Sequence, residues 1–352
     1  MTRFMNLSVV PTMRCADTRC VATIDALPAA VQALFAEPQD DLFASLAWYR
    51  VVLACGISND AAAQFLSCGN AAVFPMQTVD NGREFSSLTT LYTCLYRPLI
   101  AGAVDDVFAE FAQACRSHAL TRIDALSADW SHRAACIDAA RRAGLSVRQF
   151  AHFGNWHEAV AGQNWTTYLA DRPGTLRETI RRKLRRKHRF ELIMDGDRLE
   201  AGIEDFESVY RRSWKEPEPF PAFNAALMRA LAPLGMLRLG ILHVDGTAAA
   251  AQLWVVEKHR ATVLKLAHDE AFKAASPGTV LTALMLQRLL DEEHVSEIDF
   301  GRGDDAYKSA WASQRRQRIG LILANKLHPR GFAFLGRHAM GRVRASLRRA
   351  SG

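Results

Sequence analysis

The spacing of hydrophobic and polar residues predicts alternating helices and strands in the first half of the chain. Apolar residues recur at helical spacing in three segments, 41–55, 104–116 and 131–143. Aromatic and β-branched residues concentrate in runs that predict strands over 70–76, 121–126 and 145–154, with a strand and a loop over 88–100. This half is therefore expected to have a mixed α/β structure.

The second half has a clearer order of elements. Strands are predicted over 190–194, 236–244, 247–257, 261–268, 296–301 and 317–325, and helices over 204–214, 224–235, 276–294 and 305–313. Asp245 and Gly246 form a two-residue hairpin signal between two of the strands. The order β-α-α-β-β-β-α-β-α-β favours one mixed-sheet α+β domain over repeated βαβ units.

A joint between the halves is expected over 155–175, because Asp171-Arg172-Pro173-Gly174 breaks regular structure. Thr175 is expected to cap a helix that begins near Leu176. Apolar residues recur in that helix only at 176, 180 and 184, which leaves a wide cationic face. We therefore expect a first domain over 1–165, a second over 166–328 and a tail over 329–352.

Charge is concentrated in two segments. The chain has 352 residues and a formal charge of +7. Residues 177–189 hold eight Lys or Arg and one Glu, and residues 330–352 hold six Arg and no acid. The remainder is mildly acidic, which argues against a general nucleic-acid-binding surface.

The cysteines and the apolar runs indicate a cytoplasmic protein. All seven cysteines precede residue 137, and none forms a C-x-x-C pair. An odd number at irregular spacing favours a reducing compartment over a disulfide framework, and no metal site is expected. No apolar run reaches the ~20 residues of a membrane span, and the first residues do not suggest a cleaved signal peptide.

A first candidate site is Ala275-Ser276-Pro277-Gly278-Thr279, which follows a strand and opens a long helix. The free N–H groups and the dipole of a helix start hold phosphate well. Gly278 would let a ligand approach the backbone, and Thr279 would add a hydroxyl. The alternative is ordinary capping by Ser276 with Pro277 at the first helical position.

A second candidate is the polar segment 299–308. Gly301, Gly303 and Ala306 fit G-x-G-x-x-A, but Asp304 and Asp305 would face the pyrophosphate of a dinucleotide. Too little chain follows for a dinucleotide-binding half, so that interpretation is rejected.

The same segment offers other chemistry. Tyr307 and Lys308 are candidate proton donors or phosphate contacts, and the two aspartates are candidate bases or anchors for an amine. The alternative is a solvated loop in which one aspartate caps the next helix.

A third group surrounds the strand 261–268. Lys265 is a candidate donor contact, and His268 is a candidate general base or else a surface residue. Gln252 and Trp254 share one face of the neighbouring strand, where they line a cleft or belong to the core. Trp214 leads into a loop stiffened by three prolines, which would shape an acceptor pocket or simply connect two helices.

The second half resembles the Fem-like branch of the GNAT acyltransferases. The similarity lies in the element order and in four runs, 237–254, 265–270, 276–281 and Gly301-Arg302-Gly303-Asp304-Asp305-Ala306-Tyr307-Lys308 with Trp311. The basic helix is similar to the Arg/Lys-rich helix of Fem-type aminoacyltransferases. The resemblance implies two GNAT-like domains in tandem, the first degenerate, with the acyl donor bound in the second.

The resemblance also implies roles for single residues. Ser276, Gly278 and Thr279 would hold the donor pyrophosphate, Lys308 would lie near the reacting group, and Arg302 would contact substrate. The chain departs from the usual GNAT donor loop, Gln/Arg-x-x-Gly-x-Gly/Ala, because it has only Gly278 with Pro277 beside it. An aminoacyl-tRNA donor therefore stays open beside acyl-CoA.

The leading hypothesis is an N-acyltransferase that uses acyl-CoA, such as acetyl-CoA, as co-substrate and holds no permanent cofactor. Its acceptor would be an amine on a small molecule or glycan precursor, in envelope polysaccharide or cell-wall metabolism. The alternatives are an aminoacyl-tRNA-dependent Fem-type ligase and a non-catalytic, membrane-apposed factor for polysaccharide synthesis. In the last case the Arg-rich tail, where apolar residues interleave with Arg, would contact the membrane surface.

Overall fold

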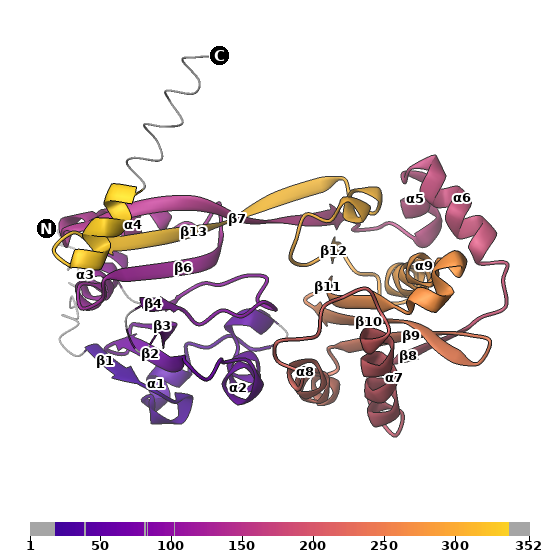
Figure 1. Ribbon diagram of the computed structural model, residues 1–352, viewed down its shortest axis with the longest axis horizontal. Coiled ribbons are helices and arrows are strands. Elements are labelled where there is room, and N and C mark those ends of the chain that lie inside the picture. Colours follow the sequence, from indigo (N-terminus) through magenta and orange to yellow (C-terminus); the bar gives the residue numbers. More distant parts are fainter. Residues whose placement is uncertain (1–17, 39, 81, 83, 102, 338–352) are drawn as a thin grey trace, which may run out of the picture.

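The computed structural model describes residues 18–337 except 39, 81, 83 and 102. Two lobes lie side by side along the long axis of the molecule (Figure 1). The elements of the first lobe are β1 (Thr18–Val21), α1 (Ala29–Gln32), α2 (Leu46–Cys55), β2 (Ala62–Cys68), β3 (Ala72–Val79), β4 (Glu84–Ser87), β5 (Leu99–Ile100), α3 (Val104–Cys115), β6 (Leu120–Ser127) and α4 (Arg133–Arg142).

The second lobe follows the predicted element order closely. Its elements are α5 (Trp165–Ala170), α6 (Gly174–Lys183), β8 (Arg189–Ile193), α7 (Leu199–Arg211), α8 (Phe223–Leu231), β9 (Leu237–Val244), β10 (Thr247–Glu257), β11 (Arg260–His268), α9 (Pro277–Asp291), β12 (Glu297–Asp299) and the short 3-10 helix η5 (Ala306–Ala310). The mixed α+β class predicted from the sequence is confirmed, and from β8 to β13 the elements follow the predicted order.

Two long strands join the lobes. Strands β7 (Leu145–Ala159) and β13 (Gln314–Asn325) pair antiparallel along nearly their whole length and run from one lobe into the other (Figure 1). β13 also pairs with β6 of the first lobe, and β12 pairs with the end of β7. The sheet is therefore continuous, with the order β1-β2-β3-β4-β6-β13-β7-β12-β11-β10-β9-β8 and β5 on β3. The division at residue 165 stays a prediction, because backbone hydrogen bonds pass through both lobes.

Three local predictions need correction. Residues 155–159, expected in the joint, continue β7 because the partner β13 supplies hydrogen bonds there. Helix α6 begins at Gly174, directly after Pro173, and Thr175 makes no cap. The segment 88–100 contains only the two-residue strand β5, and the rest is loop.

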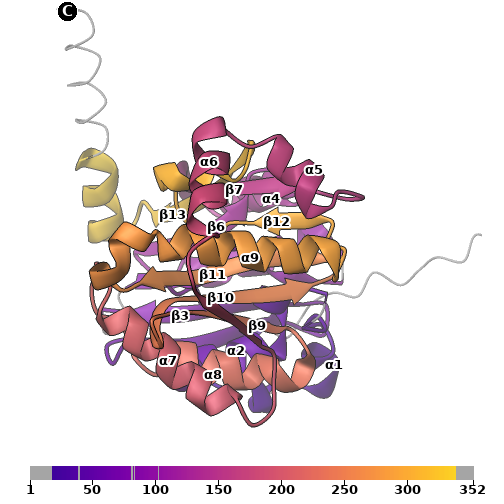
Figure 2. The same cartoon turned by 90° about the vertical axis from the view of Figure 1, so that its right-hand side faces the viewer.

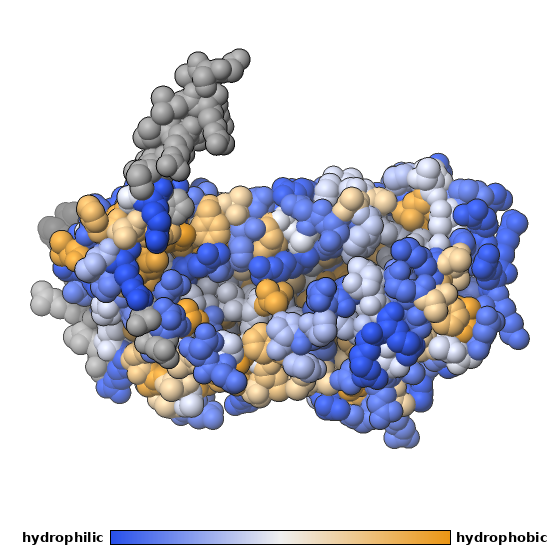
Figure 3. Space-filling view, viewed as in Figure 1, coloured by the Kyte–Doolittle hydropathy of each residue, from blue (hydrophilic) through white to orange (hydrophobic). Residues whose placement is uncertain are grey.

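Helices cover the faces of the sheet in the second lobe. Figure 2 shows α9 lying across β9–β11, with α5 and α6 on one side of it and α7 and α8 on the other. The predicted apolar seam of the basic helix is confirmed: Ile180 is buried, and Leu176 and Leu184 pack against the cluster beneath α9. Hydrophilic side chains dominate the face in Figure 3, with hydrophobic residues gathered in patches between them.

Only the first part of the predicted tail is described. Residues 329–337 are helical, and Phe332 is 70% exposed beside Arg330. Residues 338–352 and the cysteine at position 15 lie outside the described residues, so membrane contact through the tail stays a prediction. Over the described part of the chain, no helix has the length and apolar character needed to cross a membrane.

Candidate functional site

A cavity lies beside the end of β11. β12 ends at Asp299, so its pairing with β11 covers only Arg260 to Thr262. Leu266 and His268 of β11 line the cavity, together with residues of η5 and the residue after it, Trp311. The resulting cavity of about 420 Å³ is large enough for part of a small-molecule ligand.

The first turn of α9 forms the floor of this cavity. Ser276, Gly278 and Thr279 all line it, and their contact with a donor pyrophosphate stays a prediction. Ser276 adopts a left-handed conformation with φ 53° and makes no capping hydrogen bond, so ordinary side-chain capping is not what it does. Pro277 takes the first helical position. The N–H groups of the first turn have no partner within the helix and point toward the cavity end.

Gly278 leaves room beside His268. A Cβ built on Gly278 would lie 3.4 Å from His268 Nδ1, and its φ is not in the left-handed region. The backbone conformation therefore does not require glycine here. What the missing side chain provides is space between the helix start and the imidazole.

Gln252 and Trp254 hold this helix start from below. Both are buried, with 1% and 0% exposure. Gln252 Nε2 donates to Thr282 Oγ1 at 2.7 Å, Trp254 Nε1 donates to Gln252 Oε1 at 2.7 Å, and Thr282 Oγ1 donates to the Gly278 carbonyl at 2.9 Å. The expectation that Gln252 and Trp254 line a cleft is corrected, because α9 packs directly over them.

His268, Trp214 and Tyr307 meet in the cavity, although they come from three different segments. The ring centroids of Trp214 and His268 are 4.4 Å apart. Burial lowers the pKa of His268, although Glu270 Oε1, 3.3 Å from its Nε2, opposes the shift. The imidazole is therefore neutral near pH 7 and can accept a proton. Burial, with Asp305 nearby, raises the pKa of Tyr307, so its hydroxyl stays protonated.

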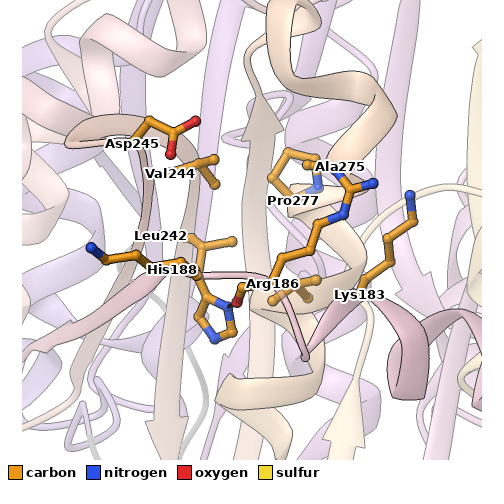
Figure 4. A pocket seen from close by; sticks show the side chains of 10 residues that line it. Lys183, Arg186, His188, Leu242, Val244, Asp245, Ala275 and Pro277 are labelled. Carbon is orange, nitrogen blue, oxygen red and sulfur yellow. Dashed lines mark hydrogen bonds between the residues drawn. The ribbon is translucent and has the colours of Figure 1, made fainter.

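A cationic pocket adjoins the same helix start. Side chains from the end of α6 and the following segment face the first residues of α9 and the β9 end, as Figure 4 shows. Lys183, Arg186 and His188 line this pocket of about 360 Å³ together with Ala275 and Pro277. Lys183 Nζ donates to the Ala274 carbonyl. Pro277 lines both this pocket and the cavity that holds His268, so both lie at the start of α9.

The segment 299–308 folds as a pinned loop. Asp299 is fully buried, where Arg316 and Asn155 Nδ2 bond its carboxylate and Gly301 N donates to its Oδ1 at 2.7 Å. Burial would raise its pKa, but Arg316 first and then these hydrogen bonds hold the pKa below its usual value. Gly301 has φ 64°, and a Cβ there would lie 2.3 Å from the Val263 carbonyl oxygen, so only glycine fits.

Lys308 is part of this loop and not of the cavity. It is 4% exposed, and its ammonium donates to the Arg302 carbonyl at 2.7 Å and lies 3.3 Å from Asp305 Oδ2. It therefore closes the loop that its own chain segment forms. The expected place of Lys308 near the reacting group is corrected for that reason.

The two aspartates also face away from the cavity. Asp304 forms a two-bond ion pair with Arg315, which lowers its pKa, and its side chain is 47% exposed. Asp305 is 62% exposed beside Lys308. Neither carboxylate lines the cavity, and a paired, ionised Asp304 is a poor proton acceptor.

Lys265 and Arg302 lie outside the cavity as well. Lys265 Nζ pairs with Glu218 Oε1 at 2.5 Å and lies 4.5 Å from the ring centre of Tyr92, which belongs to the first lobe. Arg302 packs 4.5 Å from the ring centre of Phe153 and faces a separate cavity between the lobes. Lys265 was expected to contact the acyl donor, but it instead forms an ion pair with Glu218, in the loop that contains Pro217, Pro219 and Pro221.

Sequence reasoning gave no individual role to several groups around that ion pair. Tyr92 Oη donates to Glu218 Oε2 at 2.5 Å. Burial first, and then Lys265, lower the pKa of Lys215 to about 8, and its ammonium lies 5.7 Å from the ring centre of Trp214. The only feature of the sequence that pointed to this cluster was the position of Lys215 and Glu218 on either side of Pro217. Nothing along the chain indicated that residue 92 would meet them.

Among the described residues, no group of three or more His, Cys, Asp or Glu side chains is placed to hold a metal ion. No two of the six described cysteines are joined by a disulfide.

Comparisons with known proteins agree with this geometry. The family described as acetyltransferase (GNAT) domain matches residues 174–309, from the first residue of α6 to η5. No curated protein sequence matches the chain. FemX is 11% identical, with a TM-score of 0.56 over 84% of this chain and 96% of that one.

Two further solved structures share the fold. The C-terminal domain (DUF2156) of an Agrobacterium fabrum protein, named as a candidate lysylphosphatidylglycerol synthetase, is 16% identical, with a TM-score of 0.54 over 78% of this chain and 87% of that one. L-PGS from Bacillus licheniformis is 11% identical, with a TM-score of 0.50 over 80% and 92%. Residues 174–309 therefore match the GNAT acetyltransferase domain family, and the fold of the chain is similar to the folds of FemX and of these two structures.

Proposed function

We propose that this protein transfers an acyl group from an acyl-CoA thioester to an amine. The observation that carries the proposal is that two cavities lie at the start of α9 and share Pro277, one lined by Lys183 and Arg186 and the other by His268 and Tyr307. The phosphates of the donor would lie against the free N–H groups of α9 and beside Lys183 and Arg186. The acyl end would then reach the cavity.

The reaction proposed for the cavity needs no covalent enzyme intermediate. The neutral amine attacks the thioester carbonyl and forms the new C–N bond, while His268 takes the proton that the nitrogen loses. The C–S bond then breaks, and the thiolate leaves with a proton from Tyr307. The lowered pKa of His268 and the raised pKa of Tyr307 support these two roles, because each group is in the required protonation state near neutral pH.

The acceptor is proposed to be an amine on a small molecule or a glycan precursor, in envelope polysaccharide or cell-wall metabolism. The fold shared with FemX and with lysylphosphatidylglycerol synthetases favours such an acceptor over a protein amine. Acyl-CoA is a cytoplasmic metabolite, and we propose that the reaction takes place there.

An aminoacyl-tRNA is the second candidate donor, and the charge of α6 is the observation that favours it. This helix carries Arg181 and Arg182 in its last turn, and the segment after it carries Arg186. A tRNA acceptor end would be held by such a surface mainly through its phosphates. Its binding would weaken steeply as salt rises from 50 to 200 mM.

The two donors are distinguished by one set of measurements. The purified chain is incubated with a panel of acyl-CoAs and amines, and release of the free CoA thiol is recorded. A parallel titration follows binding of an aminoacyl-tRNA at several salt concentrations. Thiol release supports acyl-CoA, whereas salt-dependent tRNA binding without thiol release supports the second candidate. Absence of turnover and of any CoA-induced change in melting temperature would refute the acyl-CoA proposal.

A further inference from the structure

A second cavity, of about 330 Å³, lies between the lobes, apart from the start of α9. The first lobe contributes Arg122, Asp124 and His152, and the second contributes Arg302 and Phe220. None of these residues borders either space at α9. The cavity therefore needs an explanation of its own.

His152 and Arg302 bring two hydrogen-bond donors close together in this cavity. His152 Nδ1 accepts a hydrogen bond from Ala125 N at 2.9 Å, so the proton of the neutral imidazole lies on Nε2. That Nε2–H faces Arg302 Nη2 at 3.2 Å, which is also a donor. The nearest carboxylate oxygen, Asp124 Oδ1, is 3.9 Å from Nε2, beyond hydrogen-bond range. Two N–H groups thus face the same space and lack a shared acceptor.

Arg302 is held in place without being neutralised. Its guanidinium stacks on Phe153 and makes a long contact, 3.4 Å, to the Thr90 carbonyl. Within the described part of the chain it has no carboxylate partner within ion-pair distance. Asp124 instead binds Arg122 through two bonds of 2.9 and 2.8 Å. The stacking leaves the polar edge of Arg302 available to a ligand.

The charge of the cavity identifies the class of ligand. Arg122 and Arg302 contribute two positive charges, Asp124 contributes one negative charge, and burial lowers the pKa of His152 and keeps it neutral. The net charge of +1 matches a carboxylate better than a doubly charged phosphate. The remaining walls include the apolar side chains of Leu91 and Phe220, which suit a short hydrocarbon body.

We propose that this cavity binds a small organic carboxylate, whose oxygens accept from Arg302 and from His152 Nε2–H. The apolar part of the ligand lies against Leu91 and Phe220. The inference does not depend on acyl transfer, because the site shares no lining residue with the donor cavity.

Butanoate is the probe, and its binding to the full-length protein is measured by saturation-transfer NMR and calorimetric titration. Acetate, hexanoate, 1-butanol and inorganic phosphate serve as comparators. Saturable binding of butanoate, with affinity rising from acetate to hexanoate and with 1-butanol and phosphate weaker, is expected. Absence of saturable binding, or equal binding of 1-butanol, overturns the proposal.

Variants locate the site and test the charge argument. Arg302→Gln is expected to weaken butanoate binding about tenfold, since a charge-assisted bond is lost. Arg229→Gln removes the same charge from an exposed ion pair with Glu200 and is expected to change nothing. Equal affinities of wild type and Arg302→Gln overturn the assignment, and Arg122→Gln gives an independent loss if the first variant does not fold.

Asp124→Asn is expected to act in the opposite direction. It raises the net charge of the cavity to +2, so phosphate should gain affinity several-fold relative to butanoate. A variant that binds phosphate no better than wild type does would overturn the match between a net charge of +1 and a carboxylate. Gly278→Ala, in the donor cavity, is expected to leave butanoate affinity unchanged. If this variant lost butanoate affinity, the carboxylate would bind in the donor cavity and not between the lobes.

Discussion

Replacing Gly278 with alanine should move stability and donor binding in opposite directions. Gly278 lies in the first turn of α9 with ordinary helical φ, and a Cβ would meet His268 Nδ1 at 3.4 Å, an ordinary contact distance. Alanine is a better helix former than glycine by about 0.5–1 kcal/mol. Dividing this gain in free energy of unfolding by the unfolding entropy of a chain of this size gives a rise in melting temperature of about 1 °C.

The same methyl group would occupy space that the proposed donor needs. Inserting a methylene into a filled site costs about 1–3 kcal/mol. We therefore expect the donor KM to rise at least about fivefold, while kcat changes little, because the lost interaction is present in both ground and transition states. The assay is steady-state release of CoA thiol, with melting temperature measured on the same samples.

Gly174→Ala is the matched control. It makes the same chemical change at the first residue of α6, where the nearest atom to the new Cβ is Arg177 Nη2 at 3.9 Å. Its donor KM should equal that of wild type. If Gly278→Ala gained stability while its donor KM also stayed at the wild-type value, the donor would not lie against the start of α9, and the reasoning would fail.

Three further predictions concern other residues. Burial raises the pKa of Glu257 from 4.5 to about 7, and its carboxylate accepts from Leu42 N at 2.7 Å. The folded state therefore binds the proton more tightly, and the free energy of unfolding should fall by up to roughly 3 kcal/mol as pH rises from about 4.5 to about 7. Urea unfolding of Glu257→Gln at pH 5 and 8 should lack that loss. His268→Asn should lower kcat/KM about 10²–10⁴-fold. It should also remove the acidic limb of the pH profile of kcat/KM, which in wild type should lie below pH 6.5 because burial lowers the pKa of His268. An unchanged pH profile would exclude His268 as the general base. Lys308→Met should reduce the free energy of unfolding by about 1–3 kcal/mol, because buried carbonyls lose their donor. Asp304→Asn, at an exposed ion pair, should reduce it by less than about 1 kcal/mol. Similar losses in the two variants would contradict the loop-closing role of Lys308.

Much of the candidate site is encoded by neighbours in the chain. The order of strands and helices after residue 190 could be predicted because hydrophobic spacing and turn residues act over a few positions. The hairpin at Asp245-Gly246 is one case, since both residues have positive φ, 49° and 80°. The start of α9 at Pro277 is another, because proline suits the first helical position and cannot donate within the helix.

The polar residues of the site were less predictable, because their roles depend on packing between distant segments. Gln252 and Trp254 alternate onto one face of a strand, but only the position of α9 decides that this face is buried. Lys308 is near Tyr307 in the sequence, yet the conformation of the loop turns its ammonium toward the Arg302 carbonyl. Local sequence patterns indicate which chemical groups are present, but they do not indicate where each side chain points in the fold.

The sequence by itself determined the mixed α+β class, the element order of the second half and the phosphate-suited start of α9. Only the tertiary structure decided that β7 and β13 run through both lobes, that His268, Trp214 and Tyr307 line one cavity, and that Tyr92 bonds Glu218 across 126 positions. The physical reason is the range of the forces involved. Backbone propensities act between neighbours, whereas hydrophobic burial and buried hydrogen bonds join whichever segments the folded chain brings together.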